Sequence, residues 1–238
     1  MSKVLITEES FKSLNYDMDQ LNVNTESASS DGNRQPTVLI VFENSDVNAA
    51  IHHLVTSLES PLCPKTVATV LVQESIRTDF EEKLLAQLKP YAKENVELTK
   101  ALETVKKLNA KVITVAGGPT LVCDFTHEHF GGQVAGLCTL HTFRTAKEAI
   151  TLVGKETLTF PNASIWHENH AYVYELVAAL KSQNYFINCF NLPLTVLEES
   201  QTQGKSFVIM ENNYHYETFA HNGIQKSIVF PVGSIFAN

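Results

Sequence analysis

One cysteine in this sequence sits where covalent chemistry could be done. Cys63 lies in the segment ESPLCPKTVATVLV, between two prolines and shortly before an apolar run typical of a β-strand, which predicts that its thiol is on a loop. A cysteine nucleophile needs a thiolate and a base, and the neighbouring Lys65 ammonium could favour the thiolate. We therefore take Cys63 as the candidate catalytic residue. Three histidines are the candidate bases: His52, His53 and His129.

The other three cysteines are interpreted differently. Cys123, Cys138 and Cys189 lie within or beside apolar runs, which favours buried structural thiols. No two cysteines have the C-x-x-C spacing, so the sequence predicts neither a disulfide framework nor a zinc knuckle. Reduced thiols indicate a cytoplasmic protein.

Histidines are the remaining candidates for metal binding. Three pairs stand out: His52 with His53, His127 with His129, and His167 with His170. Alternation along an extended segment would place His127 and His129 on one side of the chain. No third ligand follows any pair at a recognisable spacing. The sequence therefore predicts no metal site, and we expect solvated histidines beside loops.

The composition excludes some classes of partner. The chain of 238 residues is 44% hydrophobic and 18% charged, with a formal charge of -8, so it can form a core. Nucleic acids and anionic membrane surfaces bind proteins through clustered lysines and arginines. The net negative charge of this chain favours neither partner. No segment approaches the roughly 20 consecutive apolar residues that span a bilayer. We expect a soluble protein that binds neither nucleic acid nor membrane.

Alternating strands and helices must position these residues. Polar composition over residues 1–35 predicts a disordered tail, and a single domain is expected over 36–238. Short apolar runs at 37–42, 68–74 and 112–115 predict strands, and segments with helical spacing lie between them. The same alternation continues in the second half. This rhythm predicts an α/β fold with a mostly parallel open sheet and helices on both faces.

The rhythm weakens after Pro193. The segments SFVIM and QKSIVFPV predict two further strands, separated by polar, turn-rich sequence. Between them, NNYHYETF favours a packing or interface patch. These strands could form a hairpin, or an edge that docks on a partner.

Several stretches, read in order, resemble the catalytic half of aldehyde dehydrogenases. TVLIVFENSDVNAAI is similar to the family segment P-L-I-V-F-E-D-A-D-L-D-A-A, and VLVQESIRTDFEEKL is similar to V-L-V-Q-E-S-I-Y-D-E-F-V-E-K-L. EHFGGQV resembles E-I-F-G-P-V, and ASIWHEN and FINCFN resemble A-S-I-W-T-E-D and W-I-N-C-Y-N. The resemblance covers residues 36–191. The pattern also resembles a small uncharacterised insect family of shortened aldehyde-dehydrogenase-like proteins.

The resemblance implies roles for particular residues. Glu128 and Phe130 match the family's E-x-F, which contacts the nicotinamide cofactor, and Asn188 would line the old substrate cleft. Counted by its spacing from the V-Q-E segment, the family's nucleophilic cysteine corresponds to the position one residue after Cys63. The family's general base, a glutamate, corresponds by spacing to Gly32, which has no side chain that could accept a proton. In the family a cofactor domain precedes this region and also supplies an oxyanion donor; here a polar tail stands in its place, so the resemblance implies a fold that lacks this domain.

Three functions stay open at this stage. The first is a non-catalytic scaffold that acts as an interaction or structural protein, with unidentified protein partners or as a homodimer. The second is a reduced enzyme that uses the Cys63 thiol for aldehyde-dehydrogenase-like oxidation or acyl transfer, and only this reading requires NAD. The third is a small-molecule-binding module that keeps a cleft lined by Cys63, Glu128, Phe130 and Asn188. The sequence favours the first, without a cofactor.

Overall fold

Five buried parallel strands form the centre of the protein. They are β1 (Thr37–Val41), β2 (Val67–Gln73), β5 (Cys138–Phe143), β6 (Asn162–Trp166) and β7 (Asn184–Ile187). Every residue of β1 and β6 is buried, as expected where helices cover both faces of a parallel sheet. The computed structural model describes residues 34–61, 63–91, 96–131, 136–198, 204 and 206–233, with only the backbone at 96 and 97. Most of the predicted tail, including Gly32, lies outside these residues.

The strands form one sheet of ten with the order β3-β4-β5-β2-β1-β6-β7-β10-β9-β8. At one side, β3 (Val112–Thr114) pairs antiparallel with β4 (Thr120–Cys123), which is parallel to β5. At the other side, β10 (Ile224–Pro231) is parallel to β7 and antiparallel to β9 (Tyr214–His221), which pairs with β8 (Phe207–Glu211). The predicted mostly parallel sheet is confirmed.

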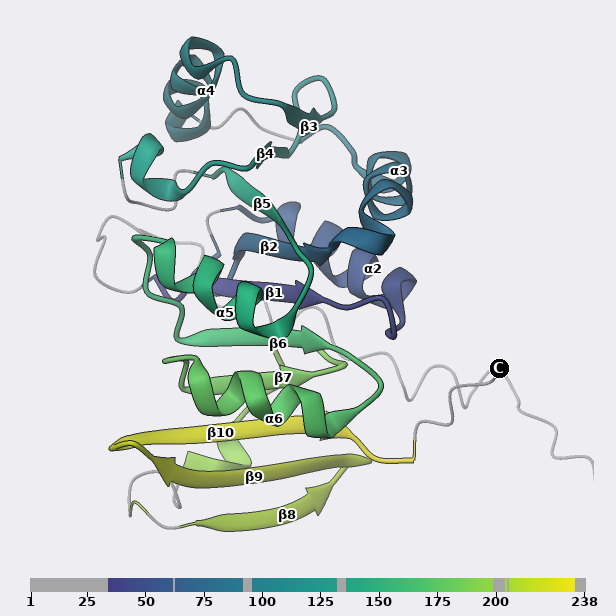
Figure 1. The fold of residues 1–238 in the computed structure, drawn as a ribbon, viewed down its shortest axis with the longest axis vertical. Helices are drawn as coiled ribbons and strands as arrows, with labels where there is room; N and C mark the ends of the chain where they lie inside the picture. Colours follow the sequence, from purple (N-terminus) through teal and green to yellow (C-terminus); the bar gives the residue numbers. More distant parts are fainter. Residues whose placement is uncertain are drawn as a thin grey trace, which may run out of the picture. The chain divides into compact units, whose positions relative to one another are not determined.

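Helices cover both faces of this sheet (Figure 1). On one face, α2 (Val47–Leu58) and α3 (Arg77–Gln87) pack against apolar residues of β1, β2 and β5. On the other face, α5 (Ala146–Lys155) and α6 (His170–Ala179) pack against β1, β6 and β7. The helix α4 (Val96–Leu108) forms a smaller apolar cluster with residues beside β4 and β5. The described residues also form three short 3₁₀ helices: η3 (Glu74–Ile76), η4 (His127–Phe130) and η5 (Thr195–Leu197).

The C-terminal strands correct one expectation. The predicted strands SFVIM and QKSIVFPV correspond to β8 and β10, but the segment between them is not only turn-rich, because it contains β9. Tyr216 and Thr218 of β9 are buried, and Tyr216 joins an apolar cluster with Phe186 and Val229. The aromatic residues of NNYHYETF therefore belong to a strand.

Candidate functional site

Cys63 lies on an exposed turn at the amino-terminal edge of the parallel sheet, just before β2. Its backbone N–H donates to the Ser60 carbonyl at 2.9 Å, and its carbonyl accepts from the Thr66 N–H at 3.1 Å. Cys63 is the one exposed cysteine, while Cys123, Cys138 and Cys189 are buried and free. Within the part of the chain that the structure describes, no hydrogen bond or ion pair reaches the Cys63 sulfur. The loop placement predicted for this thiol is thus observed.

The candidate base His53 packs away from this turn. Its ring lies 5.7 Å from that of Trp166 and 6.0 Å from that of Phe190, measured between centroids. Trp166 ends β6 at the carboxyl-terminal edge of the sheet, opposite the edge where Cys63 precedes β2. Burial, and then the charge of the neighbouring His52, lower the pKa of His53. His53 therefore serves the packing of α2.

The residues of the E-x-F match lie in η4, which precedes β5 at the same edge as Cys63. Glu128 is exposed, and Phe130 packs against the apolar cluster beneath α4. The two histidines of this segment point to different surroundings, because the segment is helical and not extended: His127 is buried and His129 is exposed. The prediction that these histidines share one side is wrong.

Asn188 does not share a cleft with Cys63, which corrects the expectation drawn from the resemblance. It follows β7 at the carboxyl-terminal edge, where its N–H donates to the Ile165 carbonyl at 2.9 Å. Its side-chain oxygen accepts from the His167 N–H, and its amide donates to the His167 carbonyl, each at 2.9 Å. Asn188 therefore fastens the turn after β7 to the turn after β6. Its backbone has a φ of 51°, a region that asparagine tolerates well.

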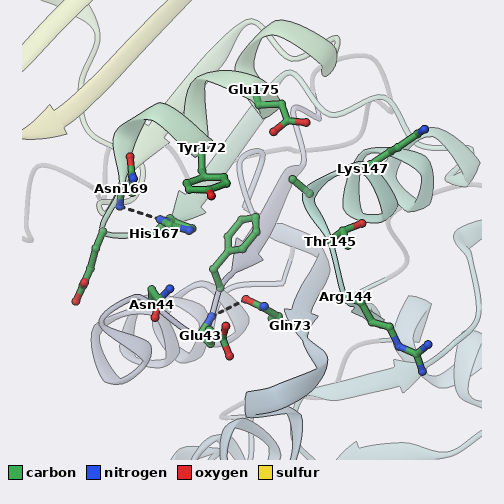
Figure 2. Close-up of a pocket in the computed structure, with 13 residues that line it drawn as sticks. Glu43, Asn44, Gln73, Arg144, Thr145, Lys147, His167, Asn169, Tyr172 and Glu175 are labelled. Carbon is green, nitrogen blue, oxygen red and sulfur yellow. Dashed lines mark hydrogen bonds between the residues drawn. The ribbon is translucent and has the colours of Figure 1, made fainter.

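A pocket of about 540 Å³ opens at this carboxyl-terminal edge (Figure 2). The residues that follow four parallel strands contribute to its wall: Phe42 after β1, Gln73 at the end of β2, Arg144 after β5 and His167 after β6. The connection from β1 runs through α2 to β2, and the connection from β6 runs through α6 to β7 on the other face and in the opposite direction. The pocket thus lies at a topological switch point, where open α/β sheets bind their ligands.

Stacked rings form one side of the pocket. The His167 ring lies 4.8 Å from that of Phe42 in an edge-on arrangement and 5.3 Å from that of Tyr172 in a stacked one. The Nδ1 atom of His167 accepts a hydrogen bond from the Asn169 N–H at 2.8 Å. Burial lowers the pKa of His167; the charge of Glu168 opposes this shift, and that of His170 adds to it. The neutral imidazole with its proton on Nε2 fits this environment.

Two helices begin at the rim of the pocket. Thr145 caps α5 by accepting from the Glu148 N–H, and Asn169 caps α6 by accepting from the Ala171 N–H. The partial positive charge of each N-terminus therefore lies beside the cavity. Arg144 pairs with Glu74 outside it, at 2.7 and 2.9 Å.

A buried carboxylate forms a second polar cluster near the opposite edge of the sheet. Glu156, at the end of α5, has a fully buried side chain. It accepts hydrogen bonds from the His127 N–H at 2.9 Å, from His141 Nε2 at 3.2 Å and from the hydroxyl of Thr139 at 3.0 Å. Burial opposes its charge, but the hydrogen bonds from His127 and His141 outweigh this effect and hold the pKa of Glu156 well below its usual value.

Sequence reasoning missed both polar sites. Glu156 stands in GKETLTF, which looks like the exposed end of a helix, so only the tertiary structure reveals its burial. The signal for the pocket was present, because polar residues follow the predicted strands at Glu43 and His167. Among the described residues, no cluster of histidine, cysteine, aspartate and glutamate is arranged for a metal ion. None of the described helices is long and apolar enough to cross a bilayer.

Comparison with solved structures identifies the fold. An NAD-dependent benzaldehyde dehydrogenase from Corynebacterium glutamicum superimposes with a TM-score of 0.55 at 17% identity, covering 70% of this chain and 41% of that one. An aldehyde dehydrogenase from Brucella melitensis biovar abortus 2308 gives 0.53 at 20% identity, covering 67% and 39%. The KauB aldehyde dehydrogenase from Pseudomonas aeruginosa gives 0.53 at 17%, covering 67% and 38%. The resemblance of fold to aldehyde dehydrogenases is confirmed.

The chain spans about 40% of the length of these dehydrogenases. No curated protein matches its sequence. The resemblance to an insect family stays a prediction. The family model for proteins of unknown function DUF1487 matches residues 33–236, and the chain therefore belongs to that family.

Proposed function

We propose that this chain is a non-catalytic protein of aldehyde-dehydrogenase-like fold that acts by binding and not by aldehyde oxidation. The observation that carries the proposal is the setting of Cys63, on an exposed turn between prolines with no base against its sulfur among the described residues. Phe130 supports it, because this ring packs beneath α4 instead of standing free to contact a nicotinamide. General base catalysis and an oriented cofactor each contribute orders of magnitude to a rate.

One experiment distinguishes this proposal from the competing hypothesis, a reduced enzyme that uses Cys63. Cys63 is the single exposed thiol, so alkylation of the folded protein by iodoacetamide reports on it, and Cys63→Ser is the control. We expect alkylation of Cys63 to be unaffected by NAD, and no NAD reduction when a panel of aldehydes is added. Protection of the thiol by NAD together with Cys63-dependent NAD reduction would establish the enzyme and refute the proposal.

We also propose that the binding partner includes a second copy of this chain, paired along β8. Among the described strands β8 is the last of the sheet, and it exposes apolar side chains on alternate faces: Phe207 is 38% exposed on one, and Val208 and Met210 are 62% and 70% exposed on the other. Unprotected apolar edges of this kind tend to pair with another strand. Antiparallel pairing of two β8 strands about a twofold axis would satisfy the free backbone groups of both edges and place the apolar side chains of the two copies side by side.

Sedimentation equilibrium over a concentration series tests this pairing. We expect the wild type to form dimers and the double variant Val208→Lys/Met210→Lys to be monomeric, because two lysines on each edge strand would face their copies. Leu85→Lys is the matched control, since Leu85 is also an exposed apolar residue (47%) but lies on α3. A monomeric wild type, or a double variant that still dimerises, would refute the pairing.

The location that we propose is the cytoplasm. Four free cysteines support it, because proteins of oxidising compartments commonly use their cysteines in disulfides. Fractionation of cells that express the tagged chain should place it with cytosolic markers. Recovery with the secreted or membrane fraction would contradict the proposal.

A further inference from the structure

The pocket at the switch point contains an unused hydrogen-bond donor. His167 is 8% exposed, and its Nδ1 is occupied by the Asn169 N–H. No residue in the described part of the chain bonds to its other ring nitrogen, Nε2. In Figure 2 the dashed line joins one edge of the ring to Asn169, and the opposite edge turns toward the interior of the pocket. Nε2 is not one of the buried side-chain atoms that lack a partner in the described residues, so it is open to the pocket, and a ligand there can accept its hydrogen bond in place of water.

The surroundings of this donor define the shape of a complementary ligand. The Phe42 ring and the stacked pair of His167 and Tyr172 offer flat apolar surfaces on the same side of the pocket. Tyr172 is 56% exposed, so much of its ring is free to cover a bound group. Rings of this kind gain stability by stacking on another flat ring.

The pocket is lined by groups of both charges. The N-termini of α5 and α6 carry partial positive charge, and Lys147 also lines the pocket. The opposing carboxylates are those of Glu43, Glu168 and Glu175. Glu43 accepts a hydrogen bond from the Ser75 hydroxyl at 2.6 Å, whereas Figure 2 shows the Glu175 carboxylate beside the cavity, near Tyr172.

We propose that this pocket binds a small aromatic carboxylate or phosphate, whose anionic oxygen accepts the His167 Nε2 hydrogen and whose ring stacks against Tyr172. The proposal does not rest on the proposed function, because the pocket lies at the opposite edge of the sheet from Cys63 and involves no residue of β8. It combines the switch-point position, the unbonded Nε2 donor of His167 and the stacked rings, which arise from different parts of the sequence.

Histidine-labelled protein, observed by heteronuclear NMR, provides the test. Benzoate and phenyl phosphate are the probes, and benzamide, which keeps the ring without the charge, is the control. We expect both anions to shift the His167 ring resonances in a saturable manner, and benzamide to bind more weakly. The proposal is overturned if neither anion shifts these resonances, or if benzamide binds as tightly.

Three variants separate the proposed contacts from a loss of folding. His167→Asn keeps an oxygen near the position of Nδ1 for the Asn169 N–H but removes the Nε2 donor, and should weaken benzoate binding about tenfold or more. Tyr172→Ala, at an exposed position, should weaken it by less. Glu175→Gln should tighten it, because a nearby negative charge is removed. Unchanged affinity in folded His167→Asn, or weaker binding in Glu175→Gln, would contradict the anion site.

Discussion

At the scale of single residues, the buried carboxylate of Glu156 joins parts of the chain that are distant in sequence. It receives hydrogen bonds from η4 through His127 and from β5 through Thr139 and His141. The Nε2 atom of His127 is buried with no partner in the described residues, so this cluster already contains one unsatisfied group. Removal of the carboxylate would leave several more donors unsatisfied.

We therefore expect Glu156→Leu to lower the free energy of unfolding by about 3–5 kcal/mol, the usual cost of breaking a buried ionic network by removing one partner. Urea denaturation followed by circular dichroism measures the change. Glu82→Gln, at an exposed position of α3, should change stability by less than about 0.5 kcal/mol. A similar loss in both variants would show that the buried network has no special role.

The lowered pKa of Glu156 also predicts how stability depends on pH. Because the folded state holds this carboxylate ionised, the unfolded state binds the proton more tightly. Its stabilising contribution is complete above the ordinary glutamate pKa of about 4.3 and is lost progressively as the pH falls below that value. Denaturation curves collected between neutral and acidic pH should show this loss, and Glu156→Gln should reduce the slope. An equal slope in wild type and variant would disprove the assignment.

The position of Asn188, away from Cys63, shows that the resemblance alone does not predict which residues share a cleft. Cys63 precedes a strand and Asn188 follows one, and in a parallel sheet these positions lie at opposite edges. The predicted strands contain this information, whereas the expected cleft follows from the resemblance, which does not include strand direction. Glu156 could not be found in this way, because burial of a carboxylate depends on which distant donors reach it.

At the scale of elements, a buried lysine joins the C-terminal hairpin to a helix. Lys226 of β10 is 1% exposed, and its ammonium donates to the carbonyls of Val177 and of Leu180, the latter at 2.8 Å. These carbonyls lie at the end of α6, where backbone acceptors lack partners within the helix. Burial lowers the pKa of Lys226, because removal from water disfavours the charged ammonium.

Replacing this lysine tests whether β10 caps α6. Lys226→Met keeps most of the side-chain volume but leaves the carbonyls without a donor, and we expect a loss of about 1–3 kcal/mol in stability. Faster amide hydrogen exchange in the last turn of α6 should accompany it. Lys155→Met, at an exposed lysine in the last turn of α5, is the control. Unchanged exchange in α6 would argue against capping.

The elements themselves were predicted unevenly. The strands β1, β2 and β6 are short, apolar runs whose composition already indicates burial on both faces. The strand β9 was missed because only two of its eight residues are buried, so its alternation is faint in the sequence. Its identity depends on its neighbours β8 and β10, and pairing between strands cannot be derived from local composition.

At the scale of the whole sheet, stability should decrease from the centre toward β8. The strand β1 has hydrogen-bonded parallel neighbours on both sides and is fully buried, whereas β8 pairs only with β9 in the described structure. Amide hydrogen exchange by mass spectrometry should therefore be slowest in β1 and fastest in β8 at low protein concentration. Raising the concentration should slow exchange in β8 if copies pair there. Fast exchange in β1 would contradict this arrangement of the sheet.

The position of β1 between β2 and β6 also affects how the chain folds. Val38 pairs with Thr69 on one side and with Ala163 on the other, so the second pairing joins residues that are far apart in sequence. Closing so long a loop carries an entropic cost that must be met before the contact stabilises anything, and sheets built on such pairings fold slowly. Until β6 arrives, the apolar edge of β1 is open to other chains. Assistance by a chaperone during synthesis would shorten this vulnerable period.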